Sequence, residues 1–264
     1  MKKFVSLTMI GLGMLTLSAC GSASEDATDE NTVVIGLDDT FAPMGFKDDA
    51  GEITGFDVDL AKAVFALSDK DVQFQPIDWS MKETELENGT IDLIWNGYSK
   101  TAEREKDVLF SETYMTNDQV LVTTKDSDIT SFDAMDGKLL GAQEGSSGYD
   151  LFEDQPAVLK ENVQDNTATL YASFNEAFID LNSGRIDGLL IDKIYADYYL
   201  NQKDALDDYN IVTGPFESED YAVGGRKDDE DLINEVNEGI DTLKENGEFK
   251  EISEKWFGED VSAE

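Results

Sequence analysis

The sequence predicts an α/β protein with two lobes, in which mixed but mostly parallel sheets are joined by two crossings of the chain. Short apolar runs alternate with segments of helical spacing, an order typical of parallel sheets. The alternation occurs twice, and a short pattern recurs with it: Gly184-Arg185-Ile186-Asp187-Gly188-Leu189 resembles Gly89-Thr90-Ile91-Asp92-Leu93-Ile94 at an offset of 95 residues. The two halves of the chain are therefore expected to contain equivalent strands.

The first half is expected to follow a strand–helix–strand–helix–strand order. Val33–Leu37 is a predicted strand, and Asp57–Leu67 is a predicted helix with its apolar residues on one face. Val72–Gln75 and Leu93–Trp95 are the next predicted strands, the latter inside an apolar run that begins after a helix-stop signal at Asn88-Gly89.

The second half repeats this order. It is predicted to contain a strand at Leu139–Ala142, a helix after Ser147, a weak strand near Val163, a helix at Phe174–Leu181 and a strand at Leu189–Ile191.

Two segments between the halves are predicted to carry the chain across. Gln119–Thr124, rich in β-branched residues, is expected to cross to the second lobe, and Tyr221–Gly224 to cross back. Lobe 1 would then contain residues 32–118 and 221–264, and lobe 2 residues 119–220. The tail is predicted to form a helix that ends at Gly247 and a closing helix over Phe249–Phe257.

The amino terminus resembles an export signal. Lys2 and Lys3 precede an apolar run, Phe4–Leu17, which is too short to span a bilayer. Leu17-Ser18-Ala19-Cys20 resembles the lipobox of bacterial lipoproteins, and ordinary cleavage near Ala19 is the alternative. We therefore expect a signal peptide over residues 1–19, a lipidated Cys20 that anchors the protein to the outer face of the cell membrane, and a disordered tether over residues 20–31.

The composition excludes several classes of function. The chain has 58 acidic residues against 20 lysines and arginines, a formal net charge of −38, so it is expected to repel nucleic acid and anionic lipid surfaces. It has no histidine and one cysteine, and Asp48-Asp49-Ala50-Gly51-Glu52 lacks the spacing of a calcium loop. Neither a metal nor a cofactor is expected.

The strongest candidate site follows the predicted strand at Leu93–Trp95. Asn96-Gly97 ends that strand, Gly97 lets a ligand approach the backbone, and Ser99 supplies a hydroxyl. Arg104 can donate two N–H groups to a planar carboxylate, and the alternative is an ion pair with a surface acid.

The repeated pattern suggests the second half of this site. Carried forward by 95 residues, it places Asp192 opposite Gly97, each at the carboxyl end of an equivalent strand. Open α/β sheets bind their ligands at that edge. A cationic group in one lobe and an anionic group in the other suit a zwitterion, and an uncompensated buried charge is costly. The residues thus favour a two-lobed receptor for a free amino acid.

Several motifs resemble the polar amino acid binding proteins of ABC importers, which have the type II periplasmic binding protein fold. The resemblance covers essentially the whole chain. The matching segments are Phe41-Ala42-Pro43-Met44-Gly45-Phe46, Gly55-Phe56-Asp57-Val58-Asp59-Leu60, the segment from Asn96 to Arg104, Phe110-Ser111-Glu112-Thr113-Tyr114, Gly145-Ser146-Ser147-Gly148, and the segment from Gly184 to Asp192. Two positions depart from the family's pattern: Gly45 stands where a glutamate is frequent, and Trp95 is bulky.

The resemblance implies a role for each candidate residue. Arg104, with Ser99 and the backbone around Asn96 and Gly97, would bind the ligand's α-carboxylate, and Asp192 its α-ammonium group. Ser146 and Ser147 would add donors from a helix N-terminus. Phe41 and Trp79 would flank the side chain, although both also suit a core, and Asp38 and Gln143 would contact its far end, although Asp38 also suits a turn.

The resemblance also implies partners. Closure of the lobes around the ligand would be recognised by ABC permease and ATPase subunits, and the protein would act as a monomer. An amino-acid sensor for a membrane receptor would use the same site. A dehydratase of similar fold would use Arg104 as a carboxylate clamp, but without histidine or a nucleophile motif no enzyme is expected. Arginine or lysine, glutamine and cystine stay open as ligands.

Overall fold

The computed structural model describes residues 31–263. The expected signal peptide, the lipidation site Cys20 and the tether as far as residue 30 lie outside the described residues. Within residues 31–263, no helix has both the length and the apolar character needed to cross a membrane.

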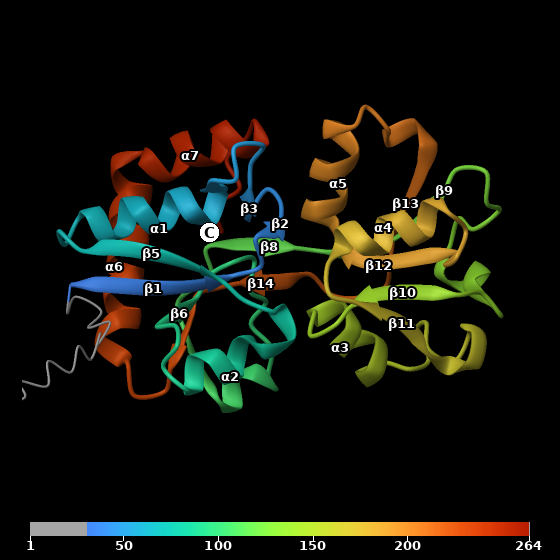
Figure 1. Cartoon of the computed structure of the whole chain (residues 1–264), viewed down its shortest axis with the longest axis horizontal. Helices are drawn as coiled ribbons and strands as arrows, with labels where there is room; N and C mark the ends of the chain where they lie inside the picture. The colour runs from blue at the N-terminus through green and yellow to red at the C-terminus, as the bar shows by residue number, and fades with distance from the viewer. Residues whose placement is uncertain (1–30, 264) are drawn as a thin grey trace, which may run out of the picture. The chain divides into compact units, whose positions relative to one another are not determined.

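The first lobe is built on a mixed five-stranded sheet. Its strands are β1 (Thr32–Leu37), β5 (Asp71–Pro76), β6 (Leu93–Ile94), β7 (Val108–Phe110) and β15 (Gly224–Arg226), and its helices are α1 (Phe56–Ala66), α2 (Lys82–Glu87), α6 (Glu230–Asn246) and α7 (Glu248–Phe257). The order is β5-β1-β6-β15-β7, with β1 parallel to β5 and β6, and β15 antiparallel to its neighbours. Figure 1 shows α1 and α2 on opposite sides of this sheet.

A small three-stranded sheet adjoins the first lobe. It contains β2 (Thr40–Phe41), β3 (Gly45–Lys47) and β4 (Ile53–Thr54), and it connects the end of β1 to the start of α1.

The second lobe repeats the parallel order and then departs from it. Its strands are β9 (Gln119–Thr124), β10 (Leu140–Gln143), β11 (Ala168–Tyr171), β12 (Gly188–Asp192) and β13 (Tyr209–Thr213), and its helices are α3 (Ser147–Asp154), α4 (Phe174–Asn182) and α5 (Lys193–Gln202). The order is β11-β10-β12-β9-β13, in which β10 is parallel to β11 and β12 while β9 is antiparallel to β12 and β13. The predicted two-lobed fold with mixed sheets is confirmed.

The repeated sequence pattern has a structural cause. Asp92 accepts a hydrogen bond from the Val34 N–H at 3.0 Å, and Asp187, 95 residues later, accepts one from the Leu139 N–H at 2.8 Å. Ile91 and Ile186 likewise each pack on a strand glycine, Gly36 and Gly141, where a Cβ atom would lie 2.5 Å from the isoleucine Cδ1. The pattern therefore marks how each central strand is attached to its neighbour.

The crossing strands differ from those predicted. β9 lies wholly within the second sheet, and the chain passes between the sheets through β8 (Met115–Asn117) and β14 (Glu219–Tyr221), which pair with each other antiparallel (Figure 1). The β-branched content of Gln119–Thr124 reflects burial in the second sheet, where five of its six residues are buried.

The strand expected near Val163 was also misplaced. Val163 is buried in a loop, and the strand of that region is β11, which begins at Ala168. β11 is an edge strand whose central residues are exposed, so it lacks the apolar signal of a buried strand.

Candidate functional site

All eleven residues singled out from the sequence border one cavity. The lining residues are Asp38, Phe41, Trp79, Asn96, Gly97, Ser99, Arg104, Gln143, Ser146, Ser147 and Asp192. Their individual roles toward a ligand stay predictions.

The cavity lies where parallel strands end. Asp38 follows β1, the loop that starts at Trp95 follows β6, Gln143 ends β10 and Asp192 ends β12. Since the carboxyl ends of parallel strands meet at one edge of a sheet, each lobe presents its polar side chains at a single edge.

Arg104 is buried and its guanidinium group reaches both lobes. Its Nη1 donates to the Ser99 carbonyl at 2.9 Å, and its Nη2 donates to the Gly145 carbonyl of the second lobe at 3.1 Å. Its guanidinium carbon lies 4.8 Å from the ring centre of Tyr98, a cation–π contact that fixes the plane of the fork. Asp150 also contacts Nη2, at 3.3 Å. A positioned planar donor of this kind suits a carboxylate.

Helix α3 directs its amino terminus at the same cavity. Ser146 is its N-cap, because the Ser146 hydroxyl accepts from the Tyr149 N–H at 3.1 Å and donates to the Gln143 carbonyl at 2.9 Å. The Ser146 hydroxyl is therefore occupied in ordering the helix. The N–H groups of Ser147 and Gly148, which precede the capped Tyr149, have no acceptor within a helix and can serve an anion.

Asp192 contributes a buried carboxyl group to the same cavity. Its Oδ1 accepts from Asn117 at 2.8 Å, Gln119 at 2.9 Å and the Tyr221 hydroxyl at 2.7 Å. Burial, and then the nearby negative charge of Glu219, raise the pKa of Asp192 to about 7. No lysine or arginine nitrogen of residues 31–263 lies within 4 Å of this carboxylate. A buried carboxylate with neutral donors on one oxygen suits a cationic ligand group.

Asp38 and Gln143 meet across the lobes. The Gln143 amide donates to Asp38 Oδ2 at 2.7 Å, and Thr40 donates to Asp38 Oδ1 through its N–H and its hydroxyl. Asp38 therefore forms a turn with Thr40 and also lines the cavity. The turn and the cavity lining, predicted as alternatives for this residue, both occur. Burial raises the pKa of Asp38.

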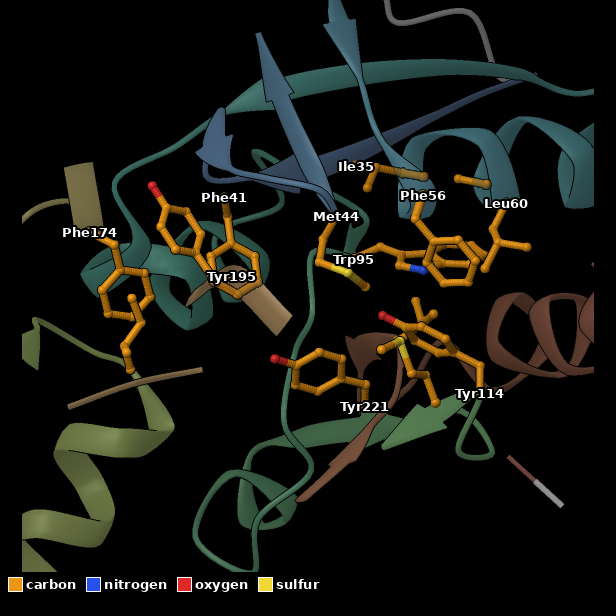
Figure 2. Packing of buried hydrophobic residues seen from close by; sticks show 14 of the residues in the cluster. Ile35, Phe41, Met44, Phe56, Leu60, Trp95, Tyr114, Phe174, Tyr195 and Tyr221 are labelled. Atoms are coloured by element: carbon orange, nitrogen blue, oxygen red, sulfur yellow. The ribbon is translucent and has the colours of Figure 1, made fainter. Parts of the chain in front are cut away.

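Phe41 and Trp79 are buried, and each also borders the cavity. Phe41 stacks on Tyr195 with ring centres 5.6 Å apart, and Phe174 lies next to both rings (Figure 2). Trp79 contacts Tyr98 edge-on at 5.9 Å. Phe41 and Trp79 therefore both belong to the core and also line the cavity.

The two departures from the family's pattern have separate explanations. Gly45 leaves room for Asn96, whose Nδ2 would lie 2.6 Å from a Cβ atom at position 45. Trp95 is 1% exposed and packs beside Tyr114, with ring centres 6.2 Å apart, so it belongs to the core (Figure 2). Gly97 has a φ of +57°, and a Cβ atom there would lie 2.7 Å from Phe41, so this turn requires glycine.

Sequence reasoning missed the polar residues that surround Asp192, namely Asn117, Gln119, Glu219 and Tyr221. They come from β8, β9 and β14, and all of them are buried. It also missed Lys82, which is 2% exposed and donates to the Gly145 carbonyl of the second lobe at 2.9 Å. The misplaced crossing hid the first group, because the crossing strands bring Asn117 and Glu219 together only when they pair.

A cavity lined from both lobes, with the cationic Arg104 and the carboxyl group of Asp192 among its residues, is what a receptor for small zwitterionic solutes requires. Residues 33–259 match bacterial extracellular solute-binding proteins, family 3, and the chain belongs to this family. An extracellular family agrees with the export predicted from the amino terminus.

Individual relatives extend over nearly the whole chain. A solved ABC uptake transporter substrate binding protein from Streptococcus pneumoniae with bound histidine is 54% identical, with a TM-score of 0.88, over 89% of this chain and 95% of that chain. The arginine-binding extracellular protein ArtP of Bacillus subtilis (strain 168) is 29% identical over 97% of this chain and 98% of its own length. The L-cystine-binding protein TcyJ of Escherichia coli (strain K12) is 31% identical over 89% of this chain and 85% of its own length.

Proposed function

We propose that the protein captures a free polar L-amino acid between its lobes and delivers it to the permease and ATPase subunits of an ABC importer, without catalysing a reaction. The observation that carries this proposal is the pairing of Arg104 and Asp192, opposite charges from different lobes that border one cavity. Only a ligand with both an anionic and a cationic group meets both charges, and an unmet buried charge is costly.

The geometry supports one orientation of the ligand. The α-carboxylate lies against Arg104 and the first turn of α3, and the α-ammonium group lies against Asp192. The side chain then passes between Phe41 and Trp79 toward Asp38 and Gln143.

The far end of the cavity favours a side chain that donates hydrogen bonds. Asp38 is a buried acceptor there, and Gln143 can both donate and accept. Two relatives are named for binding arginine and cystine, and a solved relative holds histidine. All three of these amino acids have polar side chains. We infer that the ligand belongs to the same group, with a basic or amide side chain.

A thermal-shift screen against the twenty amino acids and cystine tests the proposal, because a ligand that binds only the folded state raises the melting temperature. We expect at least one polar amino acid to raise it and Arg104→Ala to abolish the shift while remaining folded. Arg185→Ala, which removes an exposed arginine paired with Asp180, is the matched control and should keep the shift. Absence of any shift in the unmutated protein, or an undiminished shift in Arg104→Ala, would contradict the proposed function. Turnover of prephenate would favour an enzyme instead.

We further propose that Cys20 is lipidated and anchors the protein, since it follows Leu17-Ser18-Ala19 at the end of an apolar run. Cys20→Ala should move the protein from the membrane fraction to the soluble fraction. A mature protein whose mass shows no lipid, or whose first residue is not Cys20, would contradict the anchor. The protein is expected to run as a monomer in light scattering.

A further inference from the structure

A second buried carboxylate, Glu219, lies behind the lining of the cavity. Its Oε2 accepts hydrogen bonds from Ser99 at 3.1 Å, Ser147 at 3.0 Å and Gln119 at 3.0 Å. Ser99 belongs to the first lobe and Ser147 to the second, and both border the cavity. Glu219 itself stands at the start of β14, on the crossing between the lobes.

These contacts determine what the two serines can offer a ligand. Each hydroxyl has one proton. Ser147 directs its proton at Glu219, and Ser99 directs its proton at Glu219 or at Ser147, which lies 3.0 Å away. Ser99 therefore keeps its lone pairs for the cavity, whereas Ser147 also accepts from Gln119 at 3.4 Å. Lone pairs suit an ammonium group rather than a carboxylate. Arg104 and the N–H groups of α3 remain as the donors for the ligand's carboxylate.

Glu219 is also connected directly to Asp192. The Gln119 amide nitrogen donates to Asp192 Oδ1 at 2.9 Å and to Glu219 Oε2 at 3.0 Å, so one amide bridges the two carboxylates. Both side chains are buried, and no lysine or arginine nitrogen of the described chain is within 4 Å of either. Asp192 borders the cavity, and its hydrogen bonds from Asn117, Gln119 and Tyr221 all go to Oδ1.

Burial, and then the negative charge of Glu219, raise the pKa of Asp192, so Asp192 tends to hold a proton unless a nearby cation compensates the charge of the pair. The surrounding groups do not compensate it. Those that face the pair are Asn117 from β8, Gln119 from β9, Ser99 from the loop after β6, Ser147 from α3 and Tyr221 from β14, and none of them is cationic. Arg104 donates to the Ser99 carbonyl instead, and Lys193, next to Asp192, pairs with Asp197.

We propose that Glu219 is a positioning residue of the amino-acid site, which orients the Ser99 and Ser147 hydroxyls as acceptors and, through its charge, favours a proton on Asp192 until the ligand's ammonium group replaces that proton. The inference rests on the proposed function. It implies that ligand binding releases a proton and that affinity falls as the pH falls, because a proton and the ligand's ammonium group compete for Asp192.

Calorimetry in phosphate and in Tris at pH 7 measures the proton release, because the two buffers differ in ionisation enthalpy. The probes are L-arginine, L-histidine, L-glutamine and L-cystine, and any of them that binds is used for all variants, so that the ligand's own protonation cancels in the comparison. We expect the unmutated protein to release up to about one proton per ligand, and its affinity to fall by as much as about tenfold for each pH unit below 7.

Two variants and a control separate the parts of the proposal. On binding ligand, Glu219→Gln should release less than about half as many protons as the unmutated protein. Its affinity should also depend less on pH. Glu219→Asp keeps the charge but is too short to hold both serines, so it should retain proton release and bind about 3- to 10-fold more weakly. Asp220→Asn removes the same charge from the exposed neighbouring residue and should match the unmutated protein in both respects.

Two results would overturn the inference: equal proton release in Glu219→Gln and the unmutated protein, or unchanged affinity in Glu219→Asp. A loss in Asp220→Asn as large as that in Glu219→Gln would also overturn it, because the effect would then belong to the general surface charge. Failure of the unmutated protein to bind any amino acid contradicts the proposed function instead, so the two failures are distinguishable.

Discussion

The side-chain amide of Gln143 donates to Oδ2 of Asp38 at 2.7 Å, and this hydrogen bond joins the two lobes at the cavity. A ligand side chain that reaches Asp38 and Gln143 must either leave their hydrogen bond intact or replace it. Asp38 is therefore placed to distinguish side chains by their charge.

Asp38→Asn should weaken binding of L-arginine more than binding of L-glutamine. The variant loses a charge-assisted hydrogen bond to a cationic side chain, which is worth about 1.5–3 kcal/mol, whereas an amide ligand keeps a neutral one. Titration calorimetry with both amino acids measures the ratio of the two affinities. Asp39→Asn, at the neighbouring residue, is the control, and an unchanged ratio in Asp38→Asn would show that Asp38 acts only on its turn with Thr40.

Asp192→Asn should weaken closure as well as affinity. Its ammonium partner comes only with the ligand, and loss of one member of a buried, hydrogen-bonded charge pair costs about 2–5 kcal/mol, or tens to thousands fold in affinity. Small-angle scattering should show the unmutated protein becoming more compact with amino acid, while the variant stays extended at the same concentration. Equal compaction and equal affinity would mean that Asp192 plays no part in recognition.

Lys82→Met should lower the affinity for the amino acid, because it removes a hydrogen bond that joins the two lobes when they are closed. The Lys82 ammonium group donates to the carbonyls of Trp79 and, across the lobes, Gly145, and methionine fills a similar volume without donating. Loss of one charge-assisted hydrogen bond corresponds to roughly 10- to 100-fold. Stopped-flow kinetics should place most of the change in the dissociation rate. The exposed Lys106→Met is the control.

Asp57→Asn should change how stability depends on pH. Asp57 accepts from the Gly97 N–H at 2.7 Å and from the Tyr114 hydroxyl at 3.0 Å, and burial raises its pKa to about 7. The folded protein therefore holds a proton on Asp57 that the unfolded chain releases near pH 4, and this contribution to stability declines as the pH rises from about 4 to 7.

The size of this effect follows from the shift in pKa. The contribution lost between pH 4 and pH 8 is about 4 kcal/mol, and Asp57→Asn should not lose it. Urea unfolding of both proteins at several pH values gives the difference directly. Asp241→Asn, an exposed change on α6, should follow the unmutated protein. Parallel pH profiles for Asp57→Asn and the unmutated protein would refute this prediction.

Local spacing was sufficient to predict β1 and α1 to within about one residue, because their apolar periodicity is continuous. The repeat at Asp92 and Asp187 was equally informative, since each aspartate bonds to an equivalent backbone N–H. β11 escaped prediction because an edge strand with exposed central residues has little apolar signal.

The predicted site residues all border one cavity because they follow strand ends that the pattern located correctly. Gln119 and Glu219 were missed for a different reason. They are 100 residues apart in the chain and meet only where the crossing strands bring them together, a relationship that no local pattern records. A proper placement of the crossing would have pointed to Glu219, two residues before Tyr221.

The paired strands β8 and β14 form the two-stranded connection between the two larger sheets. A hydrogen-bonded ladder resists sliding, because a shift in register would break its bonds, whereas a two-stranded ribbon twists readily. Asn117 and Tyr221, which donate hydrogen bonds to Asp192, lie on this pair of strands. Two of the groups that order the Asp192 carboxyl are thus fixed by strand pairing rather than by the ligand, so we expect the ammonium site to be formed before the ligand binds.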